Sequence, residues 1–165
     1  AQARLRKAVI RGGYRLLDRR GHEAYAPGRN VVNFFSMGVM TPECVQASDA
    51  LLQRGICANV IHVTSPCVLY NGYRDANLSR MDGSGSRFQP HVESLLDVEE
   101  SHAPIVTVLD GHSHTLSFLG GVYGTRLTSL GVDEFGQSGT REELYRACRI
   151  SQADMIRAAE HALDR

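Results

Sequence analysis

The sequence predicts a three-layer α/β/α domain in which helices cover both faces of a five-stranded, mixed but mostly parallel sheet. Short apolar runs rich in β-branched residues alternate with longer segments of helical periodicity along the 165 residues, which is typical of parallel strands joined by helices. Glycines and capping residues separate these segments. The hydrophobic fraction of 42% and the charged fraction of 22% are those of a globular chain. We therefore expect one domain over residues 1–165.

The first thirteen residues predict a connecting helix. Leu5 and Val9 lie at helical spacing within a basic segment, and a pair of glycines ends it. A short strand from Tyr14 to Leu17 follows, and then a polar turn and loop over residues 18–30. Because no helix joins this strand to the next one, we expect it to pair antiparallel at an edge of the sheet.

The next segments predict a strand, a helix and a second strand parallel to the first. Val31 to Phe35 and Ala58 to Val63 are apolar runs of strand length. Between them, Thr41 is a cap residue and Pro42 fits the first helical turn, while Gly55 fits the helix end. His62 lies inside an apolar strand, and we interpret it as a hydrogen-bonded core histidine rather than a metal ligand.

The stretch from Ser65 to Arg87 predicts a long irregular surface excursion. It contains Ser-Pro, Asn-Gly and an Asp-Gly-Ser-Gly-Ser run, which are turn signals, and long loops of this kind are usually functional. Gly83 to Gly85 is no phosphate loop, since neither a Lys-Ser/Thr pair nor a preceding strand accompanies it. The apolar residues at positions 92, 95 and 96 indicate a short helix before the next strand.

The C-terminal part predicts a second crossover and two final helices. Ile105 to Leu109 and Arg126 to Leu130 are the expected strands, and the helix between them, His112 to Leu119, would end on a left-handed cap at Gly120-Gly121. A loop over residues 132–139 leads to a helix that a Thr-x-x-Glu capping box opens at residue 140. A second capped helix covers residues 151–163.

Composition excludes several classes of function. Eighteen basic and eighteen acidic side chains balance, so bulk charge recruits neither nucleic acid nor an anionic membrane. No apolar run is long enough to cross a bilayer and no signal peptide is evident, so we expect a cytoplasmic protein. We expect the four cysteines to be reduced and mostly buried, because none forms a C-x-x-C pair: Cys44, Cys57, Cys67 and Cys148.

The stretch Leu130 to Arg141, LGVDEFGQSGTR, followed by a capped helix and a second short helix, resembles the C-terminal domain of the transketolase superfamily. The resemblance is greatest to the homodimeric E1 component of pyruvate dehydrogenase, and it extends over FFSMGVMTPECVQASDALLQRGICANVIHVTSPCVLY at Phe34 to Tyr70 and VTVLDGHSHTLSFLG at Val106 to Gly120. Glu134 departs from the Gly that E1 chains often carry before Phe-Gly. Another transketolase-like enzyme, a transferase, is therefore the alternative.

The resemblance implies the C-terminal domain, residues 14–165, of a longer thiamine-diphosphate-dependent chain. The whole enzyme would be an acetyl-transferring oxidoreductase that decarboxylates pyruvate, the product of glycolysis, or another 2-oxo acid, and passes the acyl group to lipoamide. Thiamine diphosphate and magnesium would be held by a Gly-Asp-Gly motif on other domains, and this sequence has no such motif. We therefore expect this piece to have no catalytic, cofactor-binding or metal residues and to be inactive alone. Its partners would be the remaining domains, a second subunit and a lipoyl acyltransferase, and it would support the dimer and frame the active-site entrance.

Two groups of residues are candidates for an interface or a structural role. Asp110, His112 and His114 follow the end of a predicted strand, where open α/β sheets place their ligands, and we group them with Ser65 as an interface or ligand loop. A His-x-His metal site would need a third ligand that the sequence does not show. A free-standing module that binds a small anion near Gly38, Ser65 and His112 is the second hypothesis.

The resemblance also implies a structural turn in the stretch after the last predicted strand. Its members would be Phe135, Gly136, Ser138 and Gly139, with Phe135 filling a gap in the core and the glycines adopting positive φ. Ser138 lacks the G-x-S-x-G context of a nucleophile.

Overall fold

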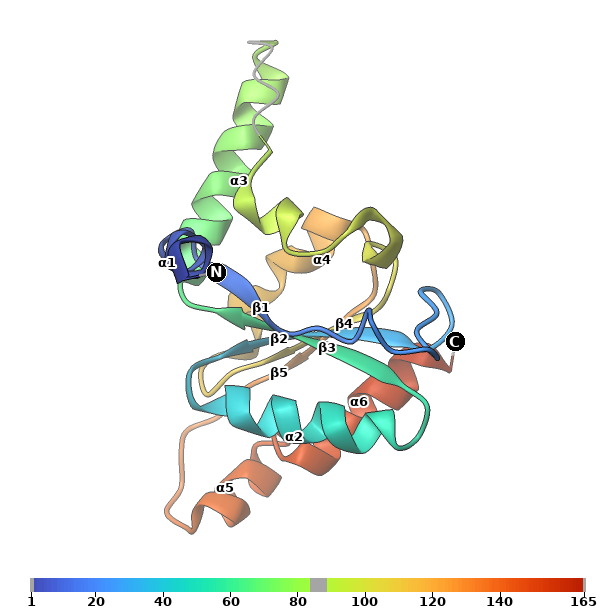
Figure 1. Ribbon diagram of the computed structural model, residues 1–165. Helices are drawn as coiled ribbons and strands as arrows, with labels where there is room; N and C mark the ends of the chain where they lie inside the picture. Colours follow the sequence, from blue (N-terminus) through green and yellow to red (C-terminus); the bar gives the residue numbers. More distant parts are fainter. Residues whose placement is uncertain (1, 84–88, 165) are drawn as a thin grey trace.

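The computed structural model describes residues 2–83 and 89–164 and confirms the three-layer α/β/α fold (Figure 1). The sheet has the strand order β1-β3-β2-β4-β5. β1 pairs antiparallel with β3 at one edge, as its loop connection predicts, and the other three pairings are parallel. The strands are β1 (Gly13–Leu17), β2 (Val31–Met37), β3 (Cys57–Val63), β4 (Ile105–Val108) and β5 (Leu127–Leu130).

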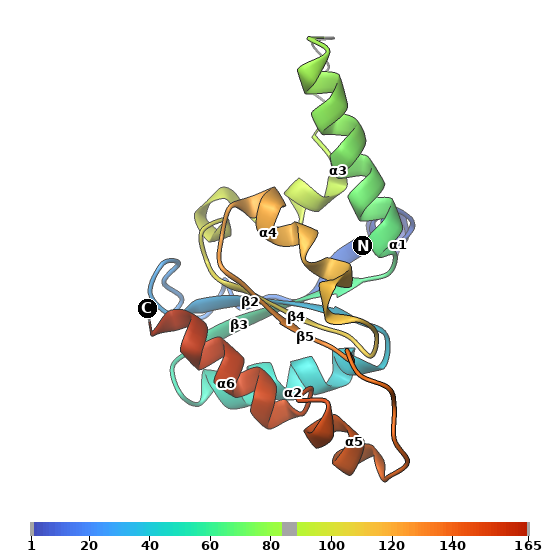
Figure 2. The same cartoon turned by 180° about the vertical axis from the view of Figure 1, so that it is seen from behind.

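The chain leaves the centre of the sheet in two opposite directions. From β2 it passes through helix α2 (Thr41–Leu52) to β3 on one side, and from β4 it passes through helix α4 (Phe118–Tyr123) to β5 on the other. The two helices cover opposite faces (Figures 1 and 2). The carboxyl ends of β2 and β4 therefore form the switch point at which open α/β sheets bind ligands or partners.

The larger core lies between the sheet and helices α2 and α6 (Gln152–Leu163). Met155 of α6 and Cys44 of α2 meet there, with 3.8 Å between their sulfur atoms and no exposed surface on either residue. Ser151 and Asp154 form a capping box at the start of α6, and the predicted box between Thr140 and Glu143 opens helix α5 (Arg141–Ala147).

A second core lies on the opposite face of the sheet. It is built by Phe35, Ile61 and Leu109 from the strands and loop ends, together with Leu69 and Leu119 from helices. The short helix predicted near residue 92 is a 3-10 helix, His91–Ser94. Another 3-10 helix, Val98–Glu100, precedes β4. The predicted connecting helix is α1 (Gln2–Ile10), which has no buried residue.

The segment after Ser65 is a long helix and not the irregular excursion that its turn signals predict. Helix α3 (Pro66–Met81) begins where the Ser65 hydroxyl accepts a hydrogen bond from the Val68 N–H at 3.3 Å. Only Leu69 and Ala76 are buried, so α3 projects far from the sheet (Figure 1). A helix that buries so little carries a weak apolar period, which is why the sequence pattern misses it. The Ser84-Gly85-Ser86 part of that prediction lies outside the described residues.

Two predicted helix ends also differ. Thr41 is the first residue of α2 and Met40 is its N-cap, without a side-chain cap bond, because the Thr41 hydroxyl bonds to His62 and Ser36 instead. The segment predicted as a helix ending at Gly120-Gly121 is a 3-10 turn, Ser113–Leu116, followed by α4, which ends at the left-handed Gly124 with φ 62°. α4 continues through Gly120 and Gly121 because Tyr123, at the end of the helix, packs against Phe35. Among the described residues, no helix combines the length and the apolar character needed to span a membrane.

A buried polar network ties the N-terminal edge strand to the rest of the fold. Glu100 is 1% exposed, and its carboxylate accepts hydrogen bonds from both terminal nitrogens of Arg15, from the Tyr25 hydroxyl and from the Asn59 amide. The Asp97 backbone N–H donates to the same carboxylate at 3.1 Å. Burial alone would raise the pKa of Glu100, but these hydrogen bonds together lower it below the usual value. The folded state therefore favours the ionised form of Glu100.

Candidate interface at the carboxyl edge of the sheet

Gly38 and Asp110 meet at the switch point between β2 and β4. Gly38 directly follows β2 and has φ 59°, a conformation that favours glycine. A Cβ atom on residue 38 would lie 3.0 Å from Oδ1 of Asp110. The Asp110 carboxylate thus lies over the turn that leaves the central strand, at the exposed carboxyl edge.

The two predicted histidines form one cluster with an aspartate that the sequence reasoning missed. The rings of His112 and His114 stack edge to face with centroids 4.1 Å apart. His112 Nδ1 lies 3.0 Å from Asp133 Oδ1, and the Ser113 N–H donates to the same oxygen at 2.8 Å. That backbone bond, with the nearby imidazoles as lesser causes, lowers the pKa of Asp133. Its position three residues after the predicted strand Arg126 to Leu130 is the one sequence signal that pointed toward it.

This cluster is fixed in position although its side chains are exposed. A Cβ on Gly131 would lie 2.6 Å from both the Ser113 backbone and the Gly111 carbonyl oxygen, so only glycine allows the two loops to come so close. The Val132 N–H donates to that same carbonyl at 2.8 Å. Backbone contacts therefore hold the loop after β4 against the end of β5, while about half of the His112 and Asp133 side-chain surface stays open to solvent.

Ser65 is not part of this cluster. It follows β3, which is separated from β4 by β2, and its hydroxyl caps α3. Of the predicted group, the structure therefore brings together Asp110, His112 and His114 and places Ser65 at the other side of the central strand. The three hollows described in the structure are lined by other residues than Gly38, Ser65 and His112.

His62 makes a side-chain hydrogen bond, as the sequence predicts, but it is half-buried at the end of β3 and is not a core residue. Its Nδ1 lies 2.8 Å from the Thr41 hydroxyl, which in turn accepts from Ser36 at 3.0 Å. Burial lowers the pKa of His62, so the imidazole is neutral at pH 7. These hydrogen bonds connect the end of β3 to the end of β2 and to the first residue of α2, and so stabilise the turn after β2.

The residues present do not fit a magnesium ion with a bound diphosphate. Within residues 2–83 and 89–164, no three His, Cys, Asp or Glu side chains are grouped as a metal site requires. At the carboxyl edge, Asp133 already accepts from the Ser113 N–H and lies beside His112, and the rings of His112 and His114 face each other.

The predicted structural turn is instead an exposed strap. Phe135 was expected to fill a core gap, yet its exposure of 103% is that of a free side chain. Gly136 and Gly139 do not have the positive φ expected of them. From residue 131 to residue 149, a segment that also includes Ser138, no residue is buried. We call residues 131–149 the arm.

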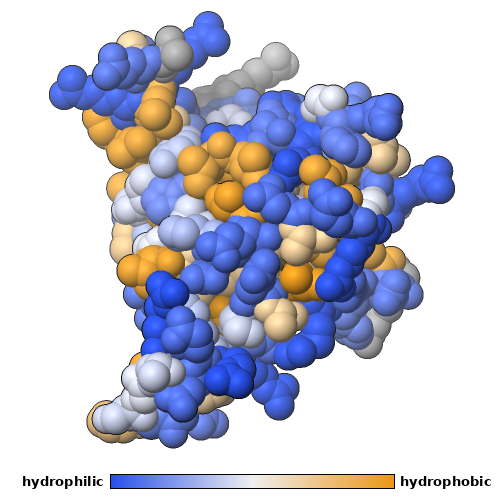
Figure 3. Space-filling model, turned by 60° about the horizontal axis from the view of Figure 1, so that its bottom comes forward, coloured by the Kyte–Doolittle hydropathy of each residue, from blue (hydrophilic) through white to orange (hydrophobic). Residues whose placement is uncertain are grey.

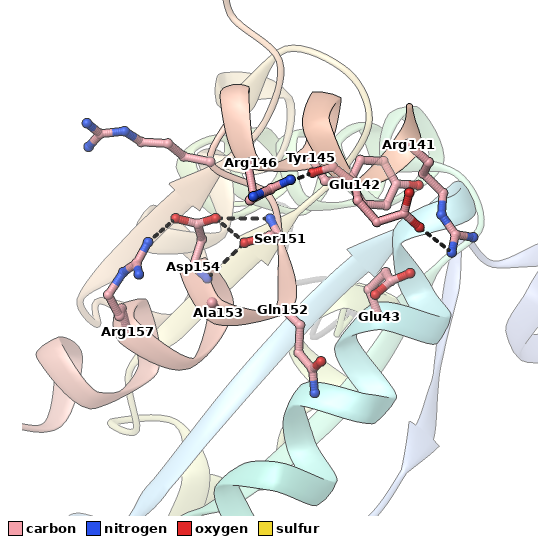
Figure 4. A pocket seen from close by; sticks show the side chains of 11 residues that line it. Glu43, Arg141, Glu142, Tyr145, Arg146, Ser151, Gln152, Ala153, Asp154 and Arg157 are labelled. Carbon is pink, nitrogen blue, oxygen red and sulfur yellow. Dashed lines mark hydrogen bonds and ion pairs between the residues drawn. The ribbon is translucent and has the colours of Figure 1, made fainter. Parts of the chain in front are cut away.

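Beside the arm lies a groove that sequence reasoning also missed. It lies between α5 and the start of α6 and has a volume of about 870 Å³ (Figure 4). Arginines are its most frequent lining residue: Arg141, Arg146, Arg149 and Arg157. The spacing of these arginines along two adjacent capped helices is the sequence signal that could have identified the groove.

Comparison with known proteins identifies the family. Residues 12–151 match the model described as the transketolase-like TK C-terminal domain. Transketolase from Campylobacter jejuni is 15% identical over 93% of this chain and 19% of its own, with a TM-score of 0.62. Transketolase from Leishmania mexicana is 17% identical over 96% and 19%, also with a TM-score of 0.62. A split-gene transketolase, an inactive β4 tetramer, is 18% identical over 85% and 44%, with a TM-score of 0.53.

These structural likenesses establish a shared fold, and the chain spans about a fifth of the length of the Campylobacter and Leishmania enzymes. A comparison with curated proteins found no match. The family match, however, covers most of the chain and includes all five strands. The chain belongs to the transketolase-like C-terminal domain family.

Proposed function

We propose that this chain acts as the C-terminal domain of a longer, thiamine-diphosphate-dependent enzyme, and specifically of an E1 component that oxidatively decarboxylates pyruvate or a related 2-oxo acid. In that enzyme the domain carries no chemistry of its own. It supports the dimer and frames the active-site entrance, while other domains bind thiamine diphosphate and magnesium. A lipoyl acyltransferase receives the acyl group. The LGVDEFGQSGTR stretch of the arm is the sequence feature that favours the E1 branch.

One observation carries the assembly role: the carboxyl-edge cluster is rigidly held but not buried. The Ser113 N–H fixes Asp133, and the close contact at Gly131 fixes the loop that carries His112 and His114. Polar groups that only stabilise the domain are usually buried and hydrogen-bonded. Solvated polar groups without a role do not require a backbone that is held in place by close contacts. A surface with defined hydrogen-bonding groups that are open to solvent suits contact with a neighbouring domain or a second subunit.

The test replaces His112 and His114 together by Ala in both the 165-residue chain and the parent enzyme. Exposed substitutions usually change stability by no more than about 0.5 kcal/mol, so the melting temperature of the 165-residue chain should stay nearly constant. The parent enzyme should dissociate at higher concentration in analytical ultracentrifugation or lose turnover. The matched control replaces His22 and His161, two exposed histidines far from the cluster.

Two outcomes contradict the assembly role. If the double variant unfolds the 165-residue chain, the histidines are structural. If the parent enzyme assembles and turns over as before, they are solvated residues without a partner.

A separate assay decides the branch. The parent enzyme should form acetyl groups on a lipoyl domain when supplied with pyruvate. Transfer of two-carbon units between sugar phosphates, without reaction of pyruvate, would instead assign the chain to the transketolase branch, which Glu134 leaves as the alternative.

A further inference from the structure

The groove between α5 and α6 is a polar hollow with an excess of arginine. Its wall consists of the first turn of α2, residues 141–146 of α5, the loop that ends at Ser151 and the first turns of α6 (Figure 4). The face that carries these helices comes forward in Figure 3, where hydrophobic surface forms separate small patches among hydrophilic residues. Such a surface suits a polar ligand better than an apolar docking helix.

Two of the four arginines already have carboxylate partners. Arg157 pairs with Asp154 at 2.5 Å, and Arg141 pairs with Glu142 at 3.3 Å. Asp154 is fully occupied, because its second oxygen caps α6 through the backbone and hydroxyl of Ser151. These pairs neutralise one another and leave little net charge.

The other two arginines form no ion pair within the described residues, although Arg146 lies close enough to Glu142 to help lower the pKa of that carboxyl group. Arg146 donates only from Nε, to the Glu142 carbonyl oxygen at 3.3 Å (Figure 4), so its terminal nitrogens remain available. The Arg149 side chain has no hydrogen-bond or ion-pair partner within the described residues. Glu43 is the one groove carboxylate without such a partner there. The groups without an ion pair therefore sum to one net positive charge, and about nine N–H donors remain free on the two guanidinium groups.

Arg149 also occupies a backbone position that normally belongs to glycine. The Ile150 N–H bonds to the Tyr145 carbonyl at 2.9 Å and the Arg149 N–H to the Arg146 carbonyl at 3.2 Å, which is a Schellman motif with Arg149 at the left-handed position. Its φ is 56°, and no other non-glycine residue in the described part of the chain has a positive φ. The backbone of Arg149 is thus in an unfavourable conformation, and its guanidinium group has no ion-pair partner. Strained residues of this kind are common at functional sites.

From these observations we propose that the groove binds a small organic phosphate through Arg146 and Arg149. Guanidinium groups match phosphate oxygens with paired, charge-assisted hydrogen bonds. The volume lies in the range of small-molecule sites and exceeds what a phosphate ion alone would fill. Tyr145, which is half-buried in the wall, offers an aromatic surface for a ring of the ligand. The proposal concerns a site distinct from the carboxyl edge and holds whether or not the E1 assignment does.

The decisive variant is Arg149→Gly, because the proposal assigns it two effects of opposite sign. Removing the left-handed arginine should raise the melting temperature of the unliganded 165-residue chain by about 2–4 °C. The same change should weaken ADP binding by about tenfold or more in isothermal titration calorimetry at low salt. Arg149→Lys keeps the charge and the backbone cost, so it should retain part of the affinity and give no thermal gain. Arg74→Ala, which removes an exposed arginine of α3 on the opposite face, should change neither binding nor groove geometry.

The choice of probe separates recognition of phosphate from recognition of a ring. Wild-type chain should bind ADP, bind pyrophosphate more weakly and not bind adenosine. The proposal is overturned if ADP does not bind at up to about 10 mM, if adenosine binds as well as ADP, or if Arg149→Gly binds ADP like the wild type. Should Arg149→Gly instead lower the melting temperature, Arg149 is a structural residue and the inference fails on that ground.

Discussion

Replacing Glu100 by Gln tests whether the buried network holds the edge strand β1 to the rest of the fold. Arg15 lies on β1, and its side chain is only 13% exposed where it meets Glu100. With Gln at position 100, the guanidinium group would keep the Leu95 carbonyl at 3.1 Å and the more distant Asp18 carboxylate at 3.8 Å. It would lose its buried counter-charge.

Breaking a buried ion pair from one side usually costs about 3–5 kcal/mol. We expect the lower end, about 3 kcal/mol, because Arg15 keeps the two other acceptors and Gln retains one carbonyl oxygen. For a chain of this size the loss corresponds to a fall in melting temperature of about 6–12 °C. Urea denaturation at pH 7 measures the free energy directly. Glu99→Gln is the matched control, because the adjacent Glu99 is exposed and its replacement should cost less than about 0.5 kcal/mol.

The pH dependence gives an independent check. The pKa of Glu100 is lowered in the folded state, whereas an unfolded glutamate has a pKa of about 4.3. The stability that Glu100 contributes is therefore fully present above pH of about 5 and is lost as the pH falls through the folded pKa. The Gln variant should lose less stability than the wild type over that acid range. A Gln variant as stable as the wild type at pH 7, or equally acid-sensitive, would show that the pair does not stabilise the fold.

Two further substitutions test the core and a backbone position. Met155→Ala removes a fully buried side chain packed on Cys44 and should cost about 2–5 kcal/mol in denaturant unfolding; a cost below about 1 kcal/mol would mean that the two-helix layer repacks freely. Gly12→Ala should destabilise by about 1–3 kcal/mol, because φ is 104° and the added Cβ would lie 2.8 Å from the Ser65 carbonyl oxygen. Gly21→Ala, where nothing lies within 4 Å, should be close to neutral, and equal effects of the two substitutions would contradict the steric argument.

Strands and buried helices could be predicted because burial leaves a pattern in the sequence. The residues of β2 and β3 are nearly all buried, so both appear as predominantly apolar runs. α2 and α6 each turn one face to the sheet and show helical periodicity. α3 buries only two of its sixteen residues and has only a weak helical periodicity. Its internal Asn71-Gly72 also resembles a turn signal. Burial is therefore one source of sequence signal and capping residues are another, since a capping box marks α5 although that helix has no buried residue.

The same principle separates the candidate site into predictable and unpredictable parts. Asp110, His112 and His114 could be placed because they directly follow a recognisable buried strand, and strand ends are fixed points of an α/β fold. Asp133 lies 21 residues after His112, and their contact depends on the pairing of β5 with β4, which local sequence patterns do not reveal.

The arm shows why a recognised motif does not reveal what its residues contact. Phe135 is the residue of LGVDEFGQSGTR that a core would most readily absorb, yet it is fully exposed, and Ile150 makes the hydrophobic contact that anchors the end of α5. The ring of Phe135 is exposed to solvent, and the Schellman turn at Arg149 leads directly into the buried Ile150. The arm is therefore attached to the domain near its two ends. Its outer surface, which includes Phe135, is exposed, and its inner surface lines the arginine groove. The stretch that carries the resemblance therefore lies on a segment whose own fold does not require Phe135, since that side chain makes no core contact.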